Sequence, residues 1–200
     1  MKKSLFIILI AIFAITACGS KRKVSRKDTG ETIDLSGYWN DTDSRLVAEE
    51  MMKDCLAQPW YEKAKKNNKN EVPRVIVGTV KNKSHEHIAT ETFTKDLERS
   101  LLNSGAVDFV ADSSQREALR EERKEQATYA SDATQQAMGE ELGAQFMVQG
   151  QINSILDSVE GQQVRFYQVE LEMIDIKTNR KVWIGQKKIK KLVEQSGHSF

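Results

Sequence analysis

The side chains best suited to chemistry in this 200-residue chain are two cysteines and one His-Glu-His sequence. Cys18 ends an apolar run, after the small residues Thr16 and Ala17 and before a glycine and a serine. Neighbours of that kind give a thiol nothing to pack against in a core. The position therefore indicates that Cys18 is modified covalently, and the residues before it indicate how.

The first 17 residues predict a secretory signal peptide. A basic start at Lys2 and Lys3 precedes an apolar run, Leu5–Ile15. The run is shorter than the roughly 20 residues that a membrane-spanning helix needs. The sequence Ile15-Thr16-Ala17-Cys18 resembles a bacterial lipobox. The resemblance implies that the thiol of Cys18 receives a diacylglycerol, that the signal is cut before Cys18, and that the new amine is acylated. Such a residue meets the requirement that stable membrane anchoring takes more than one acyl chain.

Cys55 is then the only thiol left, so the chain predicts no intramolecular disulfide. It lies at helical spacing from Met51 and Met52, on an apolar face. A reactive thiol needs a polarising neighbour, and the local sequence shows none. We interpret Cys55 as a small buried hydrophobic residue.

His85 and His87 would share one face of an extended segment and could bind a metal there. The chain has only three histidines, and no second cluster completes the coordination. We therefore interpret residues 82–87 as a solvated loop and predict no metal and no other cofactor. No nucleophile elbow, phosphate-binding glycine loop or His-Glu-x-x-His motif occurs either. The sequence predicts a binding protein and not an enzyme.

The composition is that of a globular protein, with 39% hydrophobic and 30% charged residues. Removing Lys2 and Lys3 with the signal lowers the 30 basic residues to 28 against 29 acidic ones, a net charge of −1. A nucleic-acid-binding protein would show a strong basic excess. We predict four segments: a signal peptide at 1–17, a lipid-anchored flexible tether at 18–34, one α/β domain at 35–193, and a flexible tail at 194–200. The basic tether is either a solvated linker or a segment attracted to anionic lipid headgroups.

Hydrophobic spacing predicts the order α, β, α, β, α, α, β, β, β. The helices are expected at about 41–56, 88–102, 113–129 and 131–143, and the strands at 74–80, 107–110, 144–156, 163–176 and 181–193. We interpret Asp41 and Asp43 as helix-capping residues and not as metal ligands. Residues 63–70 read as a charged loop, and Gly185 as the site of a bulge.

Three features of this pattern bear on packing. In the first strand, Val75 and Val77 are expected on one face, with Ile76 and Val80 on the other. Trp183 is expected in the core, and Trp39 is either core or a surface anchor.

Polar residues alternate with apolar ones along the last strands, at 149–153 and 168–172. Such residues form either a water-facing sheet surface or the lining of a small-molecule groove, and the pattern is the same for both. Arginines at 116, 120 and 123 lie on a highly charged helix, where they are either a solvated face or contacts for a partner.

Four stretches together resemble the LpoB-type penicillin-binding protein activators, in the form found in Bacteroidetes-type bacteria. They are DLSGYWNDTDSRLVAEEM, RVIVGTVKNKSHEHIAT, GAQFMVQGQI and DIKTNRKVWIGQKKIKK, and the similarity runs over residues 34–192. The resemblance implies an α/β fold similar to the N-terminal domain of TolB. It also implies an outer-membrane lipoprotein that faces the periplasm and stimulates a bifunctional peptidoglycan synthase. The alternative is an envelope lipoprotein that binds a small ligand or assists the assembly or transport of an envelope complex.

Overall fold

The computed structural model describes residues 24–129 and 143–194. The chain divides into two units, residues 1–31 and 32–200, and the elements described here belong to the second. Cys18 and residues 131–142 of the helix predicted at 131–143 lie outside the described residues. No helix within the described ranges is long and apolar enough to cross a bilayer.

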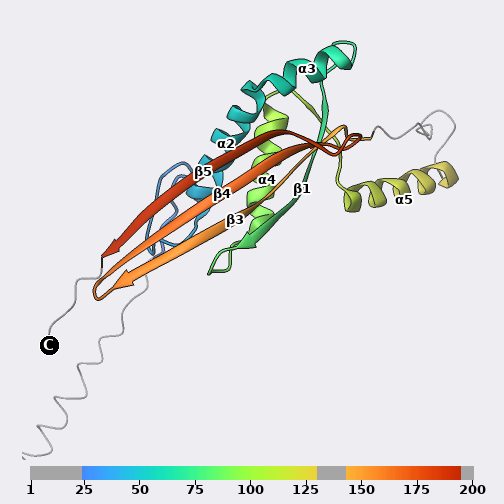
Figure 1. Ribbon diagram of the computed structural model, residues 1–200. Helices are drawn as coiled ribbons and strands as arrows, with labels where there is room; N and C mark the ends of the chain where they lie inside the picture. The colour runs from blue at the N-terminus through green and yellow to red at the C-terminus, as the bar shows by residue number, and fades with distance from the viewer. Residues whose placement is uncertain (1–23, 130–142, 195–200) are drawn as a thin grey trace, which may run out of the picture. The chain divides into compact units, whose positions relative to one another are not determined.

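Five strands form one mixed sheet in the order β2-β1-β3-β4-β5 (Figure 1). The strands are β1 (Arg74–Lys83), β2 (Asp108–Phe109), β3 (Phe146–Val159), β4 (Gln162–Asp175) and β5 (Arg180–Glu194). The helices are α2 (Asp41–Ala57), α3 (Pro59–Asn67), α4 (Thr90–Asn103) and α5 (Ser113–Tyr129). β1 pairs in parallel with β2 and β3, whereas β3, β4 and β5 form an antiparallel meander. The predicted mixed sheet with flanking helices is confirmed.

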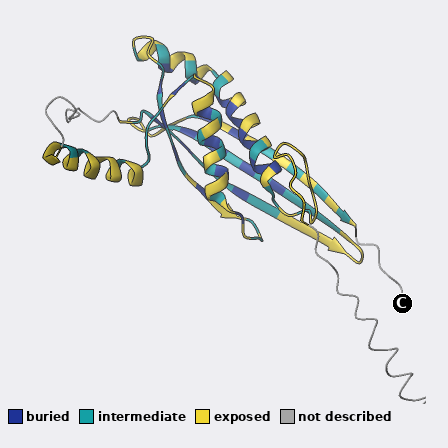
Figure 2. Ribbon diagram, turned by 180° about the vertical axis from the view of Figure 1, so that it is seen from behind, coloured by how far each residue is buried: buried dark blue, intermediate teal, exposed yellow. Residues whose placement is uncertain are grey.

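Helices α2 and α4 cover one face of the sheet, which we call the helix side (Figures 1 and 2). The predicted alternation along β3 and β4 is confirmed, because alternate residues of both strands are buried on this side. The buried residues are Phe146, Val148, Ile152, Tyr167, Val169, Leu171 and Met173. Phe93, Leu97 and Leu101 of α4 join them in one core cluster. Burial of this one apolar face is the main force that holds the helices to the sheet.

The face predicted for Val80 is wrong. Val77 pairs with Val148 and Val80 pairs with Gly150, so three steps along β1 match two steps along β3. The extra residue is a bulge, which reverses the side-chain alternation beyond it. Val80 is therefore buried on the same side as Val75 and Val77.

The bulge predicted at Gly185 lies three residues earlier in β5, at Val182. Met173 pairs with Trp183 and Ile174 pairs with Lys181, so Val182 is the extra residue. Gly185 pairs regularly with Leu171. A Cβ atom there would collide with the Trp183 indole, so the missing side chain gives that ring its place in the core.

The loop predicted at 63–70 is also wrong, since α3 continues to Asn67. Pro59 opens the helix at a position where proline costs no hydrogen bond. Trp60 and Ala64, one turn apart, are its only buried residues. Tyr61 is half-buried beside Trp60, and the other positions of α3 are polar or solvent-facing, so the sequence shows little of its buried face.

Cys55 is a buried free cysteine, as predicted. It lies on the buried face of α2, beside Met51 and Met52 in the core cluster. Burial raises the pKa of its thiol to about 12. The thiol is therefore protonated at neutral pH and chemically quiet.

Residues 33–40, which we call the N-terminal strap, lie against the sheet ahead of α2. The Trp39 ring packs edge-on against Phe93 and Tyr167, with ring centroids 5.8 and 5.7 Å apart. Tyr38 lies over the Arg165 guanidinium, 3.4 Å from the ring centroid. Trp39, whose role the sequence left open, is thus part of the packing.

Lys191 ties the strap and α2 to β5. Its ammonium lies 2.6 Å from an Asp43 carboxylate oxygen, 2.7 Å from one of Asp34, and 3.2 Å from the carbonyl of Tyr38. The side chains of Lys191 and Asp43 are only 10% and 9% exposed. Asp43 also accepts a hydrogen bond from the backbone N–H of Asn40 in a capping box, which confirms its predicted capping role. Burial raises the pKa of the Asp43 carboxyl, and the hydrogen bonds from Lys191 and Asn40 oppose that rise.

Replacing Lys191 by methionine is expected to lower the free energy of unfolding by about 3 kcal/mol at neutral pH, because it leaves a buried carboxylate without its cation. The variant raises the pKa of Asp43 further, so the deficit shrinks as the pH falls through that pKa and the carboxyl becomes neutral. Urea unfolding at several pH values measures both effects.

The matched control is Lys190→Met, one residue away on the exposed side of β5. It should change the free energy of unfolding by less than about 0.5 kcal/mol. Equal effects of the two substitutions, or a Lys191→Met deficit that does not vary with pH, would contradict the role given to Lys191.

Candidate interaction surface

The structure brings His85 next to Ser154 and not into a metal site. The ring Nδ1 of His85 lies 3.0 Å from the Ser154 hydroxyl, which also accepts a hydrogen bond from the His85 N–H at 2.9 Å. A serine beside a histidine is the start of a nucleophile–base pair, but such a pair needs a third group to orient the base. No described residue hydrogen-bonds the second ring nitrogen of His85. The contact therefore fixes the loop before α4 onto β3, and sequence could not show it because the partners are distant in the chain.

Metal binding has no support in the part of the chain that the structure describes. No three His, Cys, Asp or Glu side chains there lie close enough together to hold an ion. Among the described residues, no further side chain lies where it could complete a metal site with His85 and His87. Glu86 instead accepts a hydrogen bond from the Trp39 N–H and pairs with Arg165.

The face of the sheet opposite the helices carries polar side chains along all four long strands. Strand register places them on one side, because Gln149 pairs with Glu172 and Gln151 pairs with Glu170. We call this set the polar sheet face. Its residues are Lys81, Lys83, Gln149, Gln151, Asn153, Gln168, Glu170, Glu172, Gln186, Lys188 and Lys190.

Two carboxylates at the centre of the polar sheet face are held by neighbouring amides. Glu170 accepts hydrogen bonds from Gln151 at 3.2 Å and Gln168 at 2.6 Å. These bonds lower the pKa of Glu170, the one from Gln151 most. A hydrogen bond from Lys181, and then one from Gln149, lowers the pKa of Glu172. The centre of the face is therefore an ordered, ionised hydrogen-bond network.

Cations and apolar side chains flank this centre. Lys81, Lys83, Lys188 and Lys190 form no ion pair with any described residue. Ile155, Ile184 and Leu192 are exposed on the same side of the sheet, by 63%, 71% and 60%. A surface that combines polar groups held in place with exposed apolar residues suits contact with another protein.

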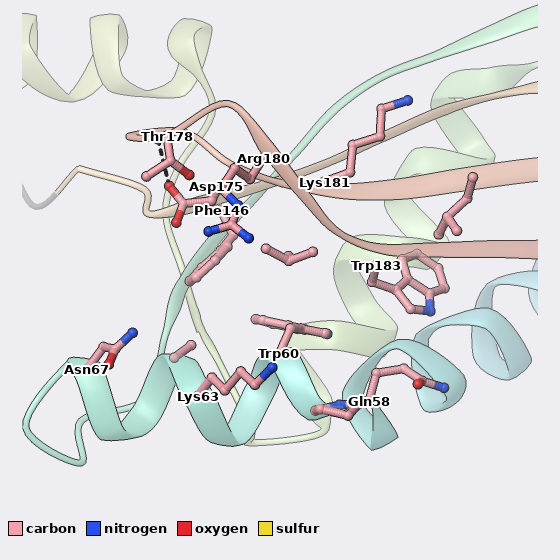
Figure 3. Close-up of a pocket in the computed structure, with 14 residues that line it drawn as sticks. Gln58, Trp60, Lys63, Asn67, Phe146, Asp175, Thr178, Arg180, Lys181 and Trp183 are labelled. Atoms are coloured by element: carbon pink, nitrogen blue, oxygen red, sulfur yellow. Dashed lines mark hydrogen bonds between the residues drawn. The ribbon is translucent and has the colours of Figure 1, made fainter.

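A hollow lies elsewhere, between α3 and the start of β5 (Figure 3). This α3–β5 cleft has a volume of about 860 Å³. Trp60, Phe146 and Trp183 form its floor, and Lys63 and Arg180 approach it from opposite sides. It does not include the polar residues at 149–153 and 168–172, which favours a water-facing surface over a groove for them. The cleft was not visible in the sequence because α3 was predicted as a loop.

Helix α5 carries Arg116, Arg120 and Arg123, and no residue of this helix is buried. A helix without buried residues fits both a solvated face and a contact for a partner. The structure therefore does not decide between these two interpretations of the arginines.

A model of the family described as "Peptidoglycan-synthase activator LpoB" matches residues 43–189 of the chain. Among solved structures, the LpoB C-terminal domain from Salmonella enterica is 12% identical, with a TM-score of 0.43, and covers 74% of this chain and 98% of that one. The NMR structure of Escherichia coli LpoB is 11% identical, with a TM-score of 0.43, and covers 90% and 85%.

Lipoprotein GNA1162 from Neisseria meningitidis is 10% identical, with a TM-score of 0.37, and covers 64% of this chain and 88% of that one. No curated protein matches in sequence. Family membership rests on the match over residues 43–189 and not on these structural scores.

The network on the polar sheet face predicts selective pKa changes. Gln151→Leu should raise the pKa of Glu170 toward its ordinary value, because it removes a hydrogen bond that favours the charged carboxylate. Gln149→Leu is the matched control, because Gln149 pairs with Glu172 on the same two strands. It should leave the pKa of Glu170 unchanged and raise the pKa of Glu172. Carboxyl ¹³C NMR titration measures both values, and an unshifted Glu170 in Gln151→Leu would show that the network does not exist in solution.

Proposed function

The chain belongs to the LpoB family of peptidoglycan-synthase activators, and from this premise we propose that it binds and stimulates a bifunctional peptidoglycan synthase, a penicillin-binding protein. It acts from the periplasmic side of the outer membrane, held there by lipid on Cys18, and performs no catalysis of its own. The observation that carries the proposal is the family match, which extends from α2 to Ile189 in β5. The ordered, exposed polar sheet face supports it, because a regulator of this kind needs a surface and not an active site.

Activation by a binding partner requires that the partner prefer the active conformation of the enzyme. A ligand shifts such an equilibrium only by its difference in affinity for the two states. A coupling free energy of about 1–3 kcal/mol corresponds to roughly 5–150-fold activation. Contacts that form only with the active synthase would supply this difference without any chemical step by the activator.

The polar sheet face is the contact surface that we infer. Its central carboxylates are already fixed by amides, so little side-chain ordering remains to oppose binding. The flanking lysines would speed encounter with an acidic surface, and the exposed apolar residues would be buried in the complex. On the other side of the sheet, α2 and α4 cover much of the described surface (Figure 2).

The test combines the purified protein with each bifunctional synthase of the organism and follows glycan polymerisation and peptide crosslinking on lipid-linked precursor. Stimulation should saturate with protein concentration. Asn153→Arg puts a bulky cation in the middle of the polar sheet face and should raise the half-saturating concentration at least about tenfold. Lys66→Glu, on the exposed side of α3, serves as the control and should not change it.

Absence of both binding and stimulation for every synthase would contradict the proposal. It would favour an envelope lipoprotein that binds a small ligand or assists an envelope complex. Stimulation that Asn153→Arg leaves intact would retain the function but reject the polar sheet face as the contact.

The lipid anchor can be tested separately at Cys18. The Cys18→Ser variant should lose its acyl chains and pass from the membrane to the soluble fraction, because nothing then holds the chain to the bilayer. Cell fractionation and the intact mass of the processed protein measure this. A variant that stays with the membrane at an unchanged mass would contradict lipidation at Cys18.

A further inference from the structure

The outer edge of β5 is open along most of its length. β5 is the last strand of the sheet and pairs only with β4. Its outward backbone N–H and C=O groups form no hydrogen bond with any other described residue. An unpaired strand edge of this kind is a template for a further strand. On the helix side, α2 reaches β5 through Asp54 with Trp183 and Glu50 with Lys187, and the strap reaches it near its end through Lys191, but these contacts use side chains of β5 and leave its outward backbone groups unpaired.

The charges beside this edge divide into two sets. Lys187 and Lys191 face the helix side and are paired with Glu50 and Asp43. Three other cations along the edge, at Arg180, Lys188 and Lys190, form no ion pair with a described residue, and neither does Lys63 of α3. Edge lysines by themselves can simply discourage aggregation. A second feature indicates that this edge binds a partner and is not only protected against aggregation.

That feature is the α3–β5 cleft, which opens along the first residues of β5. Residues 180–184 form one wall and α3 forms the other (Figure 3). Its apolar floor lies between Lys63 and Arg180, so the cleft presents an apolar surface with a cation on each side. A strand laid along β5 would point alternate side chains toward this cleft.

We propose that the outer edge of β5 binds an extended acidic segment of a partner protein by strand addition, with an apolar side chain of that segment in the α3–β5 cleft. Backbone pairing supplies affinity, and the cleft together with the unpaired cations supplies selectivity for apolar and acidic side chains. This surface shares Lys188 and Lys190 with the polar sheet face but does not include its central carboxylates, Glu170 and Glu172. The inference does not depend on which protein the chain activates.

The test uses the full-length protein and three labelled synthetic heptapeptides. The first alternates glutamate with valine and phenylalanine, the second replaces each glutamate by lysine, and the third replaces two apolar residues by proline to remove backbone donors. The first peptide should bind, with an affinity that falls as salt rises. The other two should bind at least about tenfold more weakly. Amide hydrogen exchange should show new protection at outward-facing N–H groups of residues 182–188 only with the first peptide.

Charge reversal locates the site on the protein. The double variant with Lys63→Glu and Arg180→Glu should weaken binding of the acidic peptide about tenfold or more, since rim charges govern encounter with a charged partner. Lys83→Glu is the matched control, an unpaired lysine on β1 away from this edge, and should leave the affinity unchanged. Both positions changed in the double variant are exposed, so circular dichroism should show the native fold.

Three results would overturn the inference. The acidic peptide could fail to bind at millimolar concentration. The proline peptide could bind equally well, which would indicate charge attraction without strand pairing. The protein alone could form a concentration-dependent dimer that the double variant abolishes, which would assign the edge to a second copy of the chain. If the protein binds the acidic peptide but does not stimulate any synthase, the proposed activation is contradicted and the strand-addition site is retained.

Discussion

The one-sided apolar face of the long antiparallel strands is the constraint on which the rest of the structure depends. Each of β3 and β4 points apolar side chains to the helix side and polar ones to the other. Helices α2 and α4 can therefore bury their own apolar faces on only one side of the sheet. The opposite side must stay exposed, and the last strand must end the sheet without a neighbour. The polar sheet face and the open edge of β5 both follow from this arrangement.

Within that arrangement, two bulges, the strap and the contacts of Lys191 decide which surfaces stay exposed to solvent. The bulges at 78–79 and at Val182 adjust the register so that Val80 and Trp183 return to the core. The strap and the Lys191 cluster close the C-terminal end of β5, whereas the start of β5 stands beside the α3–β5 cleft. One edge strand is thus covered at one end and available at the other.

This organisation suits a protein that acts through contact. The described residues offer a carboxylate–amide network and unpaired lysines, but no nucleophile with an oriented base and no group of metal ligands. Binding through side chains that are already held in place loses little conformational entropy.

The sequence by itself determined the features that depend on local pattern. Alternation in β3 and β4, capping by Asp43, burial of Cys55, and the mixed sheet with flanking helices all follow from spacing between near neighbours. Helix α3 was missed because only Trp60 and Ala64 are buried in it, and Phe146, against which Trp60 packs, is far away in the chain. The reversed face of Val80, the pairing of Lys191 with Asp43, and the cleft beside β5 were decided only by tertiary structure. Each of these depends on register or on contacts between distant segments, for which single-chain periodicity carries no signal.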